Sequence, residues 1–457
     1  MKLWNQNLRR IHFVGIGGMG MNGLAEVLVR SGYAVSGSDL RESFPLRRLR
    51  QLGARIQIGH EASNLGQAQL VVYSTAVPLD NPEVREAMRK GLVVQHRSEV
   101  LAELMRHRWG IAVSGTHGKT TVASMIATVL LGAGLDPTAI IGARLPSIGG
   151  NARLGKGHLL VAEADESDRS FLRLPAVCSV VTNIDMDHMD VYRDLQDLGE
   201  TFLKFMNNSA PNGQVVACGD DRNLSGILKR VHREVVTYGT MEEARVRGRK
   251  IRLAELGSSY DCYLEGHFLG SMELKVPGCH NVLNSLAAVA VGLWLKIPFP
   301  LMASSLGAFE GAQRRLDRKG EKDGVLVIDD YAHHPAEISA SLEACRHMGR
   351  RIITIFQPHR YSRTQHLMTK MNACFGNSDR LYLLDIYGAG EAPLPGVTSE
   401  RLAAEIRHHR DVTYVPNKEL MLDLLGRETR PGDLILTLGA GNVNEIGEEF
   451  LEQESDR

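Results

Sequence analysis

The segment Gly115-Thr116-His117-Gly118-Lys119-Thr120-Thr121 has the composition of a phosphate-binding loop. It lies between an apolar run at 110–113, predicted to be a strand, and a predicted helix. In such a loop, backbone N–H groups surround the phosphates, the lysine meets the β and γ oxygens, and the hydroxyl of Thr120 reaches Mg²⁺. Val113 stands where the usual spacing has a glycine, so this loop is a shorter variant. The pattern predicts ATP or GTP binding, with a chance match as the alternative.

Acidic residues follow two further apolar runs, 159–162 and 179–182, which are predicted to be buried strands. Because ligands bind at the carboxyl ends of parallel strands, we expect these residues to lie near the phosphate-binding loop. Carboxylates with an imidazole suit a hard cation such as Mg²⁺ that also holds phosphate oxygens. The alternative is a pair of solvated acidic loops. The residues concerned are Glu163, Asp165 and Glu166 after the first run, and Asn183, Asp185, Asp187, His188 and Asp190 after the second.

A glycine-rich turn, Gly15-Ile16-Gly17-Gly18-Met19-Gly20, follows a predicted strand at 11–14 and precedes a segment with helical spacing. Strand, glycine turn and helix are the parts of a Rossmann-like unit, in which the helix N-terminus attracts a phosphate. Asp39 follows a second predicted strand at 34–37, where an acidic side chain often meets a ribose. We predict nucleotide or nucleotide-sugar binding here, against a glycine turn that serves only packing.

From about Arg318 onward, predicted strands and helices alternate regularly, which indicates a doubly wound α/β unit. Polar residues collect at the strand ends, where a ligand is expected. His333 and His334 are adjacent and precede Pro335, so a helix-capping or contact role is favoured over metal binding. Arg360 and Arg363 suit a carboxylate or phosphate, since a guanidinium forms paired hydrogen bonds with either.

The chain has 457 residues, of which 43% are hydrophobic, which is enough for about three domains. Its formal net charge is 0, so no overall basic excess favours nucleic acid or anionic lipid. The six cysteines are scattered without a CxxC pair, which argues against a zinc ribbon or a disulfide scaffold. The uncharged stretch at 276–295 contains a proline, a histidine and two asparagines and is interpreted as a loop that leads into a buried helix. We expect a cytoplasmic protein without membrane insertion.

The chain resembles the Mur ligase family over nearly all of its length, in three-domain order. The resemblance implies an α/β fold with an N-terminal Rossmann-like domain, a central P-loop domain and a C-terminal doubly wound Rossmann-like domain. The expected domains are residues 1–107, which bind a UDP-sugar, 108–315, which bind ATP, and 316–457, which close over ATP and bind an amino acid. The matching motifs are the 115–121 loop, Glu163-Ala164-Asp165-Glu166-Ser167-Asp168, Asp187-His188-Met189-Asp190, Gly278 with His280-Asn281 and Asn284, Arg314-Arg315, Asp329-Asp330-Tyr331-Ala332-His333-His334-Pro335 and Phe356-Gln357-Pro358-His359-Arg360-Tyr361-Ser362-Arg363.

Within the family, the last two motifs look like those of the members that add L-alanine. The resemblance implies ATP-dependent ligation of L-alanine to the lactyl carboxylate of UDP-N-acetylmuramic acid, through an acyl phosphate, in cytoplasmic peptidoglycan synthesis. The nearest alternative is the recycling ligase of the same family, which attaches a preformed tripeptide. The implied partners are small molecules only, with the chain a monomer or homodimer, and the implied cofactor is Mg²⁺, as two ions, with ATP as co-substrate.

The resemblance also implies a role for individual residues. The implied catalytic residues are Lys119, Glu163, His188, His359 and Arg360, and the implied metal ligands are Thr120, Glu163 and His188. Besides the loop 115–121, the implied ATP-binding residues are Asn281, Asn284, Arg314 and Asp330. The implied substrate-binding residues are Gly17, Gly18, Asp39, His60, Ser74, His333, Arg360 and Arg363.

Lys204 lies where several related ligases carry a carbamylated lysine, although an unmodified surface lysine is the simpler interpretation. Two other classes of protein are weighed against a ligase. An NAD-dependent oxidoreductase would use the first glycine turn but leaves the phosphate-binding loop unexplained. A nucleotide sensor would bind ATP and UDP-sugar without consuming either.

Overall fold

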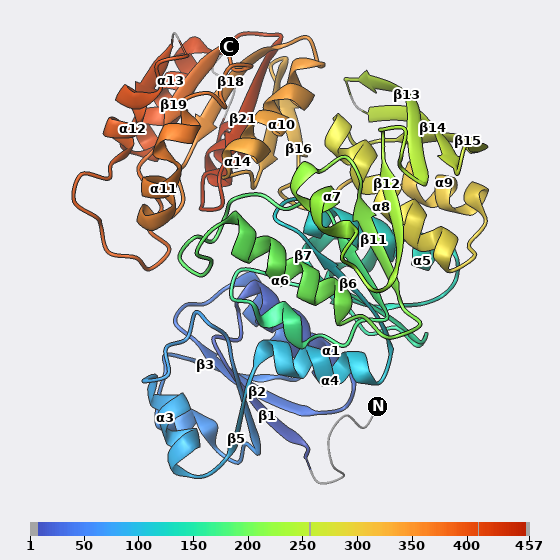
Figure 1. The fold of residues 1–457 in the computed structure, drawn as a ribbon. Coiled ribbons are helices and arrows are strands. Elements are labelled where there is room, and N and C mark those ends of the chain that lie inside the picture. The colour runs from blue at the N-terminus through green and yellow to red at the C-terminus, as the bar shows by residue number, and fades with distance from the viewer. Residues whose placement is uncertain (1–7, 256, 410, 454–457) are drawn as a thin grey trace. The chain divides into compact units, whose positions relative to one another are not determined.

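The computed structural model describes residues 8–255, 257–409 and 411–453 (Figure 1). The chain divides into two compact units. The first unit contains residues 1–249, 261–272 and 283–307, and the second contains 250–260, 273–282 and 308–457. The described strands form three β-sheets, of which one belongs wholly to residues 1–107.

The first sheet has five parallel strands in the order β3-β2-β1-β4-β5. Buried apolar residues such as Ile11 and Phe13 place β1 at its centre. The strand order changes direction between β1 and β4, and this is where an open parallel sheet binds its ligand. The elements are β1 (Arg10–Val14), α1 (Met19–Arg30), β2 (Ala34–Asp39), α2 (Phe44–Gln51), β3 (Arg55–Ile58), β4 (Leu70–Tyr73), α3 (Pro82–Arg89), β5 (Val93–His96) and α4 (Arg97–Arg106).

The second sheet of this unit carries the phosphate-binding loop, and within the unit its order is β12-β11-β10-β6-β9-β7-β8. The strands β6, β9 and β10 are parallel and adjacent, so their carboxyl ends lie together. Only the pair β7 and β8 is antiparallel among these seven. The elements are β6 (Trp109–Ser114), α5 (Lys119–Gly132), β7 (Thr138–Leu145), β8 (Gly150–Arg153), β9 (Leu159–Glu163), β10 (Cys178–Val181), α6 (Leu195–Asn207), β11 (Gln214–Cys218), α7 (Arg222–Leu228), β12 (Glu234–Gly239) and α9 (Phe299–Gly307).

Four elements have residues in both units. They are β13 (Val246–Ala254), β14 (Gly257–Leu264), β15 (His267–Leu274) and α8 (Cys279–Trp294). The start of β13 pairs in parallel with β12. The chain therefore passes between the units several times rather than once.

The second unit is built on a six-stranded sheet in the order β16-β17-β21-β18-β19-β20. All its pairs are parallel except that of β16 with β17. Two apolar clusters pack against its strands, one with Leu342 and Phe356 and the other with Ile355 and Met421. The elements are β16 (Asp317–Lys322), β17 (Val325–Asp330), α10 (Pro335–Arg346), β18 (Arg351–Phe356), α11 (Tyr361–Met371), β19 (Arg380–Leu383), α12 (Ser399–Glu405), β20 (Val412–Tyr414), α13 (Lys418–Glu428), β21 (Asp433–Leu438) and α14 (Asn444–Glu452).

The structure confirms the predicted α/β class, the glycine turn between β1 and α1, and the alternation after 318. It also confirms that the stretch at 276–295 leads into a helix, α8. Among the described residues, no helix combines the length and apolar character needed to cross a membrane. The strands between 214 and 274 and the antiparallel edge strand β16 were not predicted. In β13, β14 and β16, polar residues obscure the period-two pattern.

The close packing of Gly37 in β2 against residues of β1 and the glycine turn allows a direct test of the first sheet. A Cβ atom on Gly37 in β2 would lie 2.6 Å from Ile16 and 2.7 Å from the carbonyl oxygen of Phe13. We expect Gly37→Ala to lower the free energy of unfolding of the first unit by about 1–3 kcal/mol, because the added methyl group would force the neighbouring backbone to shift. In contrast, Gly226→Ala in α7 has open space around it and should be neutral or stabilising. Chemical denaturation of both variants checks this, and equal stability of the two would contradict the packing argument.

Candidate functional site

Two glycines with positive φ shape the phosphate-binding loop. Gly115 has a φ of 134° and Gly118, the N-cap of α5, has a φ of 81°. No residue with a side chain fits at either position. A Cβ on Gly115 would lie 2.0 Å from Thr182 Oγ1, and one on Gly118 would lie 2.8 Å from Asn284 Oδ1. The loop therefore lies between a strand, β6, and a helix, α5, as predicted, and Asn284 lies beside it.

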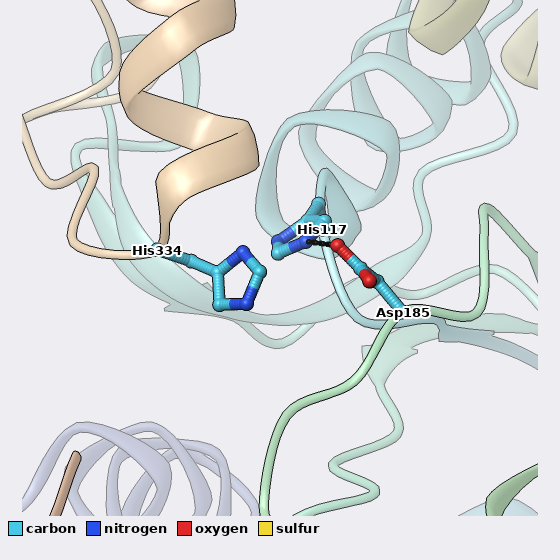
Figure 2. Close-up of side chains that lie close together, drawn as sticks. All are labelled: His117, Asp185 and His334. Carbon is cyan, nitrogen blue, oxygen red and sulfur yellow. Dashed lines mark hydrogen bonds and ion pairs between the residues drawn. The ribbon is translucent and has the colours of Figure 1, made fainter. Parts of the chain in front are cut away.

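The loop is fixed by the end of β10. The backbone N–H of His117 donates to Asn183 Oδ1 at 2.8 Å, and Thr182 Oγ1 donates to the carbonyl oxygen of His117 at 2.6 Å. The imidazole of His117 contacts Asp185, with Nε2 3.2 Å from Oδ2 (Figure 2). Residues 182–185 thus orient the loop whose N–H groups are predicted to surround phosphates.

Lys119, the first residue of α5, is held within the loop. Its ammonium donates to Glu166 Oε1 at 2.8 Å and to the carbonyl oxygens of Gly115 and Thr116 at 2.5 and 3.1 Å. Burial disfavours the charged amine, but the carboxylates around it, Glu166 first, outweigh this and raise the pKa of Lys119. The cation is therefore present at neutral pH where a phosphoryl group would need it.

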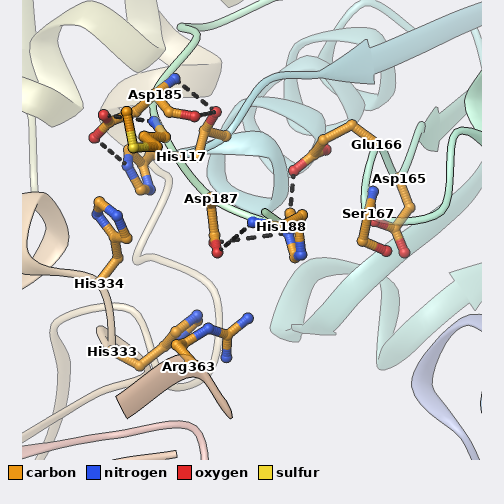
Figure 3. Close-up of polar contacts among 12 residues, drawn as sticks. His117, Asp165, Glu166, Ser167, Asp185, Asp187, His188, His333, His334 and Arg363 are labelled. Carbon is orange, nitrogen blue, oxygen red and sulfur yellow. Dashed lines mark hydrogen bonds and ion pairs between the residues drawn. The ribbon is translucent and has the colours of Figure 1, made fainter. Parts of the chain in front are cut away.

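Atoms that could ligate a cation lie near Lys119. Thr120 Oγ1 donates to Glu163 Oε2 at 3.1 Å, and Nε2 of His188 lies 3.7 Å from Glu166 Oε1 (Figure 3). Glu166 is 1% exposed, and among the described residues its Oε2 has no hydrogen-bond partner. A buried carboxylate oxygen without a donor costs free energy unless something else binds it. Of the predicted ligands, Thr120 contacts Glu163 and His188 lies near Glu166.

The N-terminal glycine turn lies at the switch point of the first sheet, as predicted. The N–H of Gly17 donates to Asp39 Oδ2 at 2.8 Å, so Asp39 orders the turn itself. His60 contacts Ser38 Oγ through Nδ1 at 2.9 Å, and Ser38 Oγ donates to Glu83 Oε2 at 2.6 Å. Gly18, the N-cap of α1, and Ser74, which directly follows β4, lie at the same edge of the sheet.

Glu83 was not predicted as part of this region. It is 0% exposed and also contacts Nε2 of His12 at 3.1 Å and accepts from Asn64 Nδ2 at 2.6 Å. Burial works against its charge, but these contacts outweigh burial and lower the pKa of Glu83. Its partners His12, Ser38 and Asn64 come from three separate segments, so no local motif could have indicated it.

In the second unit, Arg314 and Asp330 each have several partners. Arg314 donates to Asp329 Oδ2 at 2.9 Å and to the carbonyl oxygens of Gly439 and Gly441 at 2.7 and 2.8 Å. Asp330 accepts from the N–H groups of Leu316 and Ala332 at 2.9 and 2.8 Å and from Ser341 Oγ at 3.1 Å. Asn281, in the same unit, donates from Nδ2 to the carbonyl oxygen of Pro277 at 2.8 Å.

The predicted amino-acid residues of the second unit form one group. The rings of His359 and Tyr387 stack with centroids 5.7 Å apart, and His333 lies 6.1 Å from His359. Arg363 Nη1 donates to Nδ1 of His359 at 3.2 Å, so Nε2 carries the proton of the neutral ring. Burial, assisted by the cations nearby, lowers the pKa of His359 to about 3. His359 is therefore a neutral hydrogen-bond donor at physiological pH.

Two neighbours of this group have structural contacts. Arg360 has a φ of 66° and its guanidinium lies 4.0 Å from Glu391. His334 caps α10 in a capping box with Glu337, which confirms the capping role favoured over metal binding. Lys204 is exposed on α6, as a surface lysine would be.

The buried Asp330 carboxyl group predicts a pH effect on stability. Burial raises its pKa to about 6, above its value in the unfolded chain. The folded second unit therefore binds more protons than the unfolded chain between about pH 4 and 6, and this group destabilises the fold as pH rises through that window. The contribution is on the order of 3 kcal/mol, given about 1.4 kcal/mol per pKa unit and a rise of about two units.

We expect Asp330→Asn to remove this part of the pH dependence, whatever its effect on absolute stability. Thermal unfolding of the full chain and the variant at several pH values from 4 to 7 measures the difference between the two curves. A constant difference across the range would show that folding does not raise the pKa of Asp330.

Comparison with known proteins gives a consistent result over the whole chain. The model for the Mur ligase family catalytic domain matches residues 10–109, the Mur ligase middle domain matches 113–292, and the Mur ligase glutamate ligase domain matches 314–441. The UDP-N-acetylmuramate–L-alanine ligase of Trichlorobacter lovleyi is 50% identical over 452 residues, 98% of this chain and 99% of that protein. The enzyme of the same name from Solidesulfovibrio magneticus is 51% identical over 98% of both chains. The crystal structure of the UDP-N-acetylmuramate-alanine ligase of Thermotoga maritima superposes with a TM-score of 0.83 at 28% identity, covering 97% of this chain and 98% of that one.

Proposed function

This chain belongs to the Mur ligase family, and we infer that it is the ADP-forming ligase that joins L-alanine to UDP-N-acetylmuramate in peptidoglycan synthesis. The observation that carries this conclusion is the 50% identity with ligases of that name over almost the whole chain. We place the reaction in the cytoplasm and assign the UDP-sugar to residues 1–107, ATP to 108–315 and the amino acid to 316–457.

The chemistry requires activation of a carboxylate, because a carboxylate is a poor electrophile. We propose that the lactyl carboxylate of the sugar attacks the γ-phosphorus of ATP, releasing ADP and forming an acyl phosphate. The amine of L-alanine then attacks the acyl carbon, and phosphate leaves from the tetrahedral intermediate as the amine loses its proton. Positioning and charge stabilisation account for most of such a rate enhancement.

Lys119 is the residue best placed to neutralise charge on the transferring phosphoryl group. Its ammonium lies at the start of α5, beside the N–H groups of residues 115–121. Phosphate oxygens can replace the carbonyl oxygens that Lys119 contacts, while Glu166 keeps the side chain in place. We propose that Asn284 borders the same nucleotide, and that Asn281, Arg314 and Asp330 are also ATP-binding residues.

The residues around Glu163 fit Mg²⁺. Carboxylate and hydroxyl oxygens are the preferred ligands of this ion, and the buried Glu166 Oε2 has no donor among the described residues. We propose that Thr120 and Glu163 hold one ion and His188 a second, with Glu166 Oε2 available to either. When bound, the ions offset the negative charges of the phosphates and of the sugar carboxylate. The chain itself orients Glu163 through the N–H of Gly142 and the hydroxyl of Thr120.

At the sugar-nucleotide site, we propose that Gly17 and Gly18 approach the diphosphate at the N-terminus of α1. Asp39, His60 and Ser74 would then border the uridine and sugar. In the second unit, His333, His359, Arg360 and Arg363 would bind the amino acid or the acyl phosphate. His359 would donate Nε2–H there, since Arg363 occupies its Nδ1.

The activity is tested by phosphate release from ATP and Mg²⁺ with UDP-N-acetylmuramic acid and one of four acceptors. We expect release to require both the sugar nucleotide and L-alanine, with a product that mass spectrometry identifies as UDP-N-acetylmuramoyl-L-alanine. The other acceptors are glycine, L-serine and the tripeptide L-Ala-γ-D-Glu-meso-diaminopimelate. Release with the tripeptide alone would replace this function by that of the recycling ligase.

Charge removal at Lys119 should abolish phosphoryl transfer more than binding. We expect Lys119→Met to lower kcat by at least ~100-fold, the scale seen when one preorganised charge stabiliser is lost. Lys229→Met, at the exposed C-cap of α7, serves as the matched control and should stay within about two-fold of the unchanged chain. A kcat of Lys119→Met that stays close to that of the control would contradict the role of Lys119.

A further inference from the structure

The loop 163–168 that follows β9, here called the acidic loop, makes contacts in two directions. Glu163 and Glu166 contact the phosphate-binding loop through Thr120 and Lys119. Asp165 and Asp168 instead contact Arg97, the first residue of α4, and Thr75, which follows β4, both in the same compact unit. In Figure 3, Glu166 faces His188, whereas Asp165 lies beside Ser167, away from that histidine.

Each carboxylate oxygen of Asp165 accepts a hydrogen bond from the protein, although the side chain is 37% exposed. Arg97 Nη2 donates to its Oδ2 at 2.7 Å, and the N–H of Ser167 donates to its Oδ1 at 3.0 Å. Arg97 is the first residue of α4, and its guanidinium also borders the N-terminal glycine turn, since a Cβ on Gly20 would lie 2.9 Å from Nη1. One side chain therefore connects the glycine turn with the acidic loop.

Asp168 ends a directed chain of hydrogen bonds. The N–H of Ser98 donates to Nδ1 of His96, so the proton of this imidazole is on Nε2. Nε2 lies 3.1 Å from Thr75 Oγ1, and Thr75 donates its own proton to Asp168 Oδ2 at 2.5 Å. The N–H of Ser170 donates to Asp168 Oδ1 at 2.9 Å. Thr75 adjoins Ser74, one of the residues proposed above for the sugar nucleotide.

We propose that Asp165 and Asp168 are positioning residues that fix the sugar-nucleotide site against the phosphate-binding loop, rather than further ligands of the cations. Their oxygens already accept hydrogen bonds from the chain, unlike Glu166 Oε2. The acidic loop thereby links Thr75 and the glycine turn to Lys119 and Thr120 of the phosphate-binding loop. This inference rests on the proposed function, because it takes the N-terminal residues as the sugar-nucleotide site and the phosphate-binding loop as the ATP site.

The alternation of the side chains supports this division of roles. Asp165 and Asp168 accept from Arg97 at the start of α4 and from Thr75 after β4, while Glu163 and Glu166 accept from Thr120 and Lys119 at the start of α5. The side chains of His96 and Asp168 are only 8% and 11% exposed, so solvent cannot replace a lost partner easily. The contacts of Asp168 with Thr75 and His96, here called the junction, are therefore mostly buried and differ from a surface ion pair.

The test is a double-mutant cycle on Thr75→Val and Asp168→Ala. Isothermal titration first measures binding of UDP-N-acetylmuramic acid to the unchanged chain, and failure to bind would count against the proposed function rather than the junction. Each single variant should weaken that binding by about ten-fold. The double variant should be no weaker than either single variant, because both remove the same contact.

Three readouts separate a positioning role from a metal role or a general loss of structure. The KM for ATP and the Mg²⁺ concentration for half-maximal activity should change less than two-fold, while the KM for the sugar nucleotide rises. Thr75→Ser, which keeps the hydroxyl, should restore binding. Glu200→Ala, which removes a surface ion pair with Arg230 in the same unit, is the matched control and should leave binding unchanged.

The proposal is overturned by any of three outcomes. Sugar-nucleotide binding that is unchanged in Asp168→Ala would show that the junction positions nothing. Additive effects in the cycle would show that Thr75 and Asp168 act separately. A large rise in the Mg²⁺ requirement of Asp168→Ala would make Asp168 a cation ligand instead.

Discussion

The first unit depends on one buried cation, the ammonium of Lys119. A buried lysine would lose its proton unless anions surround it, and three carboxylates of the acidic loop do so. Those carboxylates in turn must be balanced by donors, which come from Thr120, Arg97 and the N–H groups of the chain. The requirement for charge balance therefore extends from the phosphate-binding loop to the N-terminal sheet. It also explains why one short loop contacts both of the predicted nucleotide sites.

In the second unit, the charge that gathers at the strand ends is positive. Arg314, Arg360 and Arg363 bring positive charge to the carboxyl ends of its strands, and His359 stays neutral among them. A neutral imidazole that donates from Nε2 adds a directed hydrogen bond without further repulsion between cations. The buried Asp330 is the counterpart, since burial favours its protonated form. Both groups keep their positions while avoiding an unbalanced buried charge.

Sequence reasoning succeeded where the signal is local. The glycine turn at 15–20, the loop at 115–121 and the acidic residues at 163–166 are short patterns whose geometry follows from residue type and from the strand before them. It missed Arg97, Thr75 and Glu83, because their importance arises from contacts across 68, 93 and 71 residues of sequence. Nothing in the segments around them distinguishes these residues from ordinary polar residues. The polar hairpin strands after 246 were missed for a related reason, since long-range pairing rather than pattern defines them.

The repeated passage of the chain between its two units has a consequence for how the protein is made. Residues 250–260 and 273–282 leave the ribosome before residue 308, yet they belong to the unit that the later residues complete. Within that unit, Glu255 lies 3.8 Å from Arg350, a residue synthesised almost a hundred positions later. The first unit is therefore complete once residue 307 has been synthesised, whereas the second unit must wait until its last strand, β21, has been synthesised. In the interval, the early segments lack the later residues with which they pack in the finished chain.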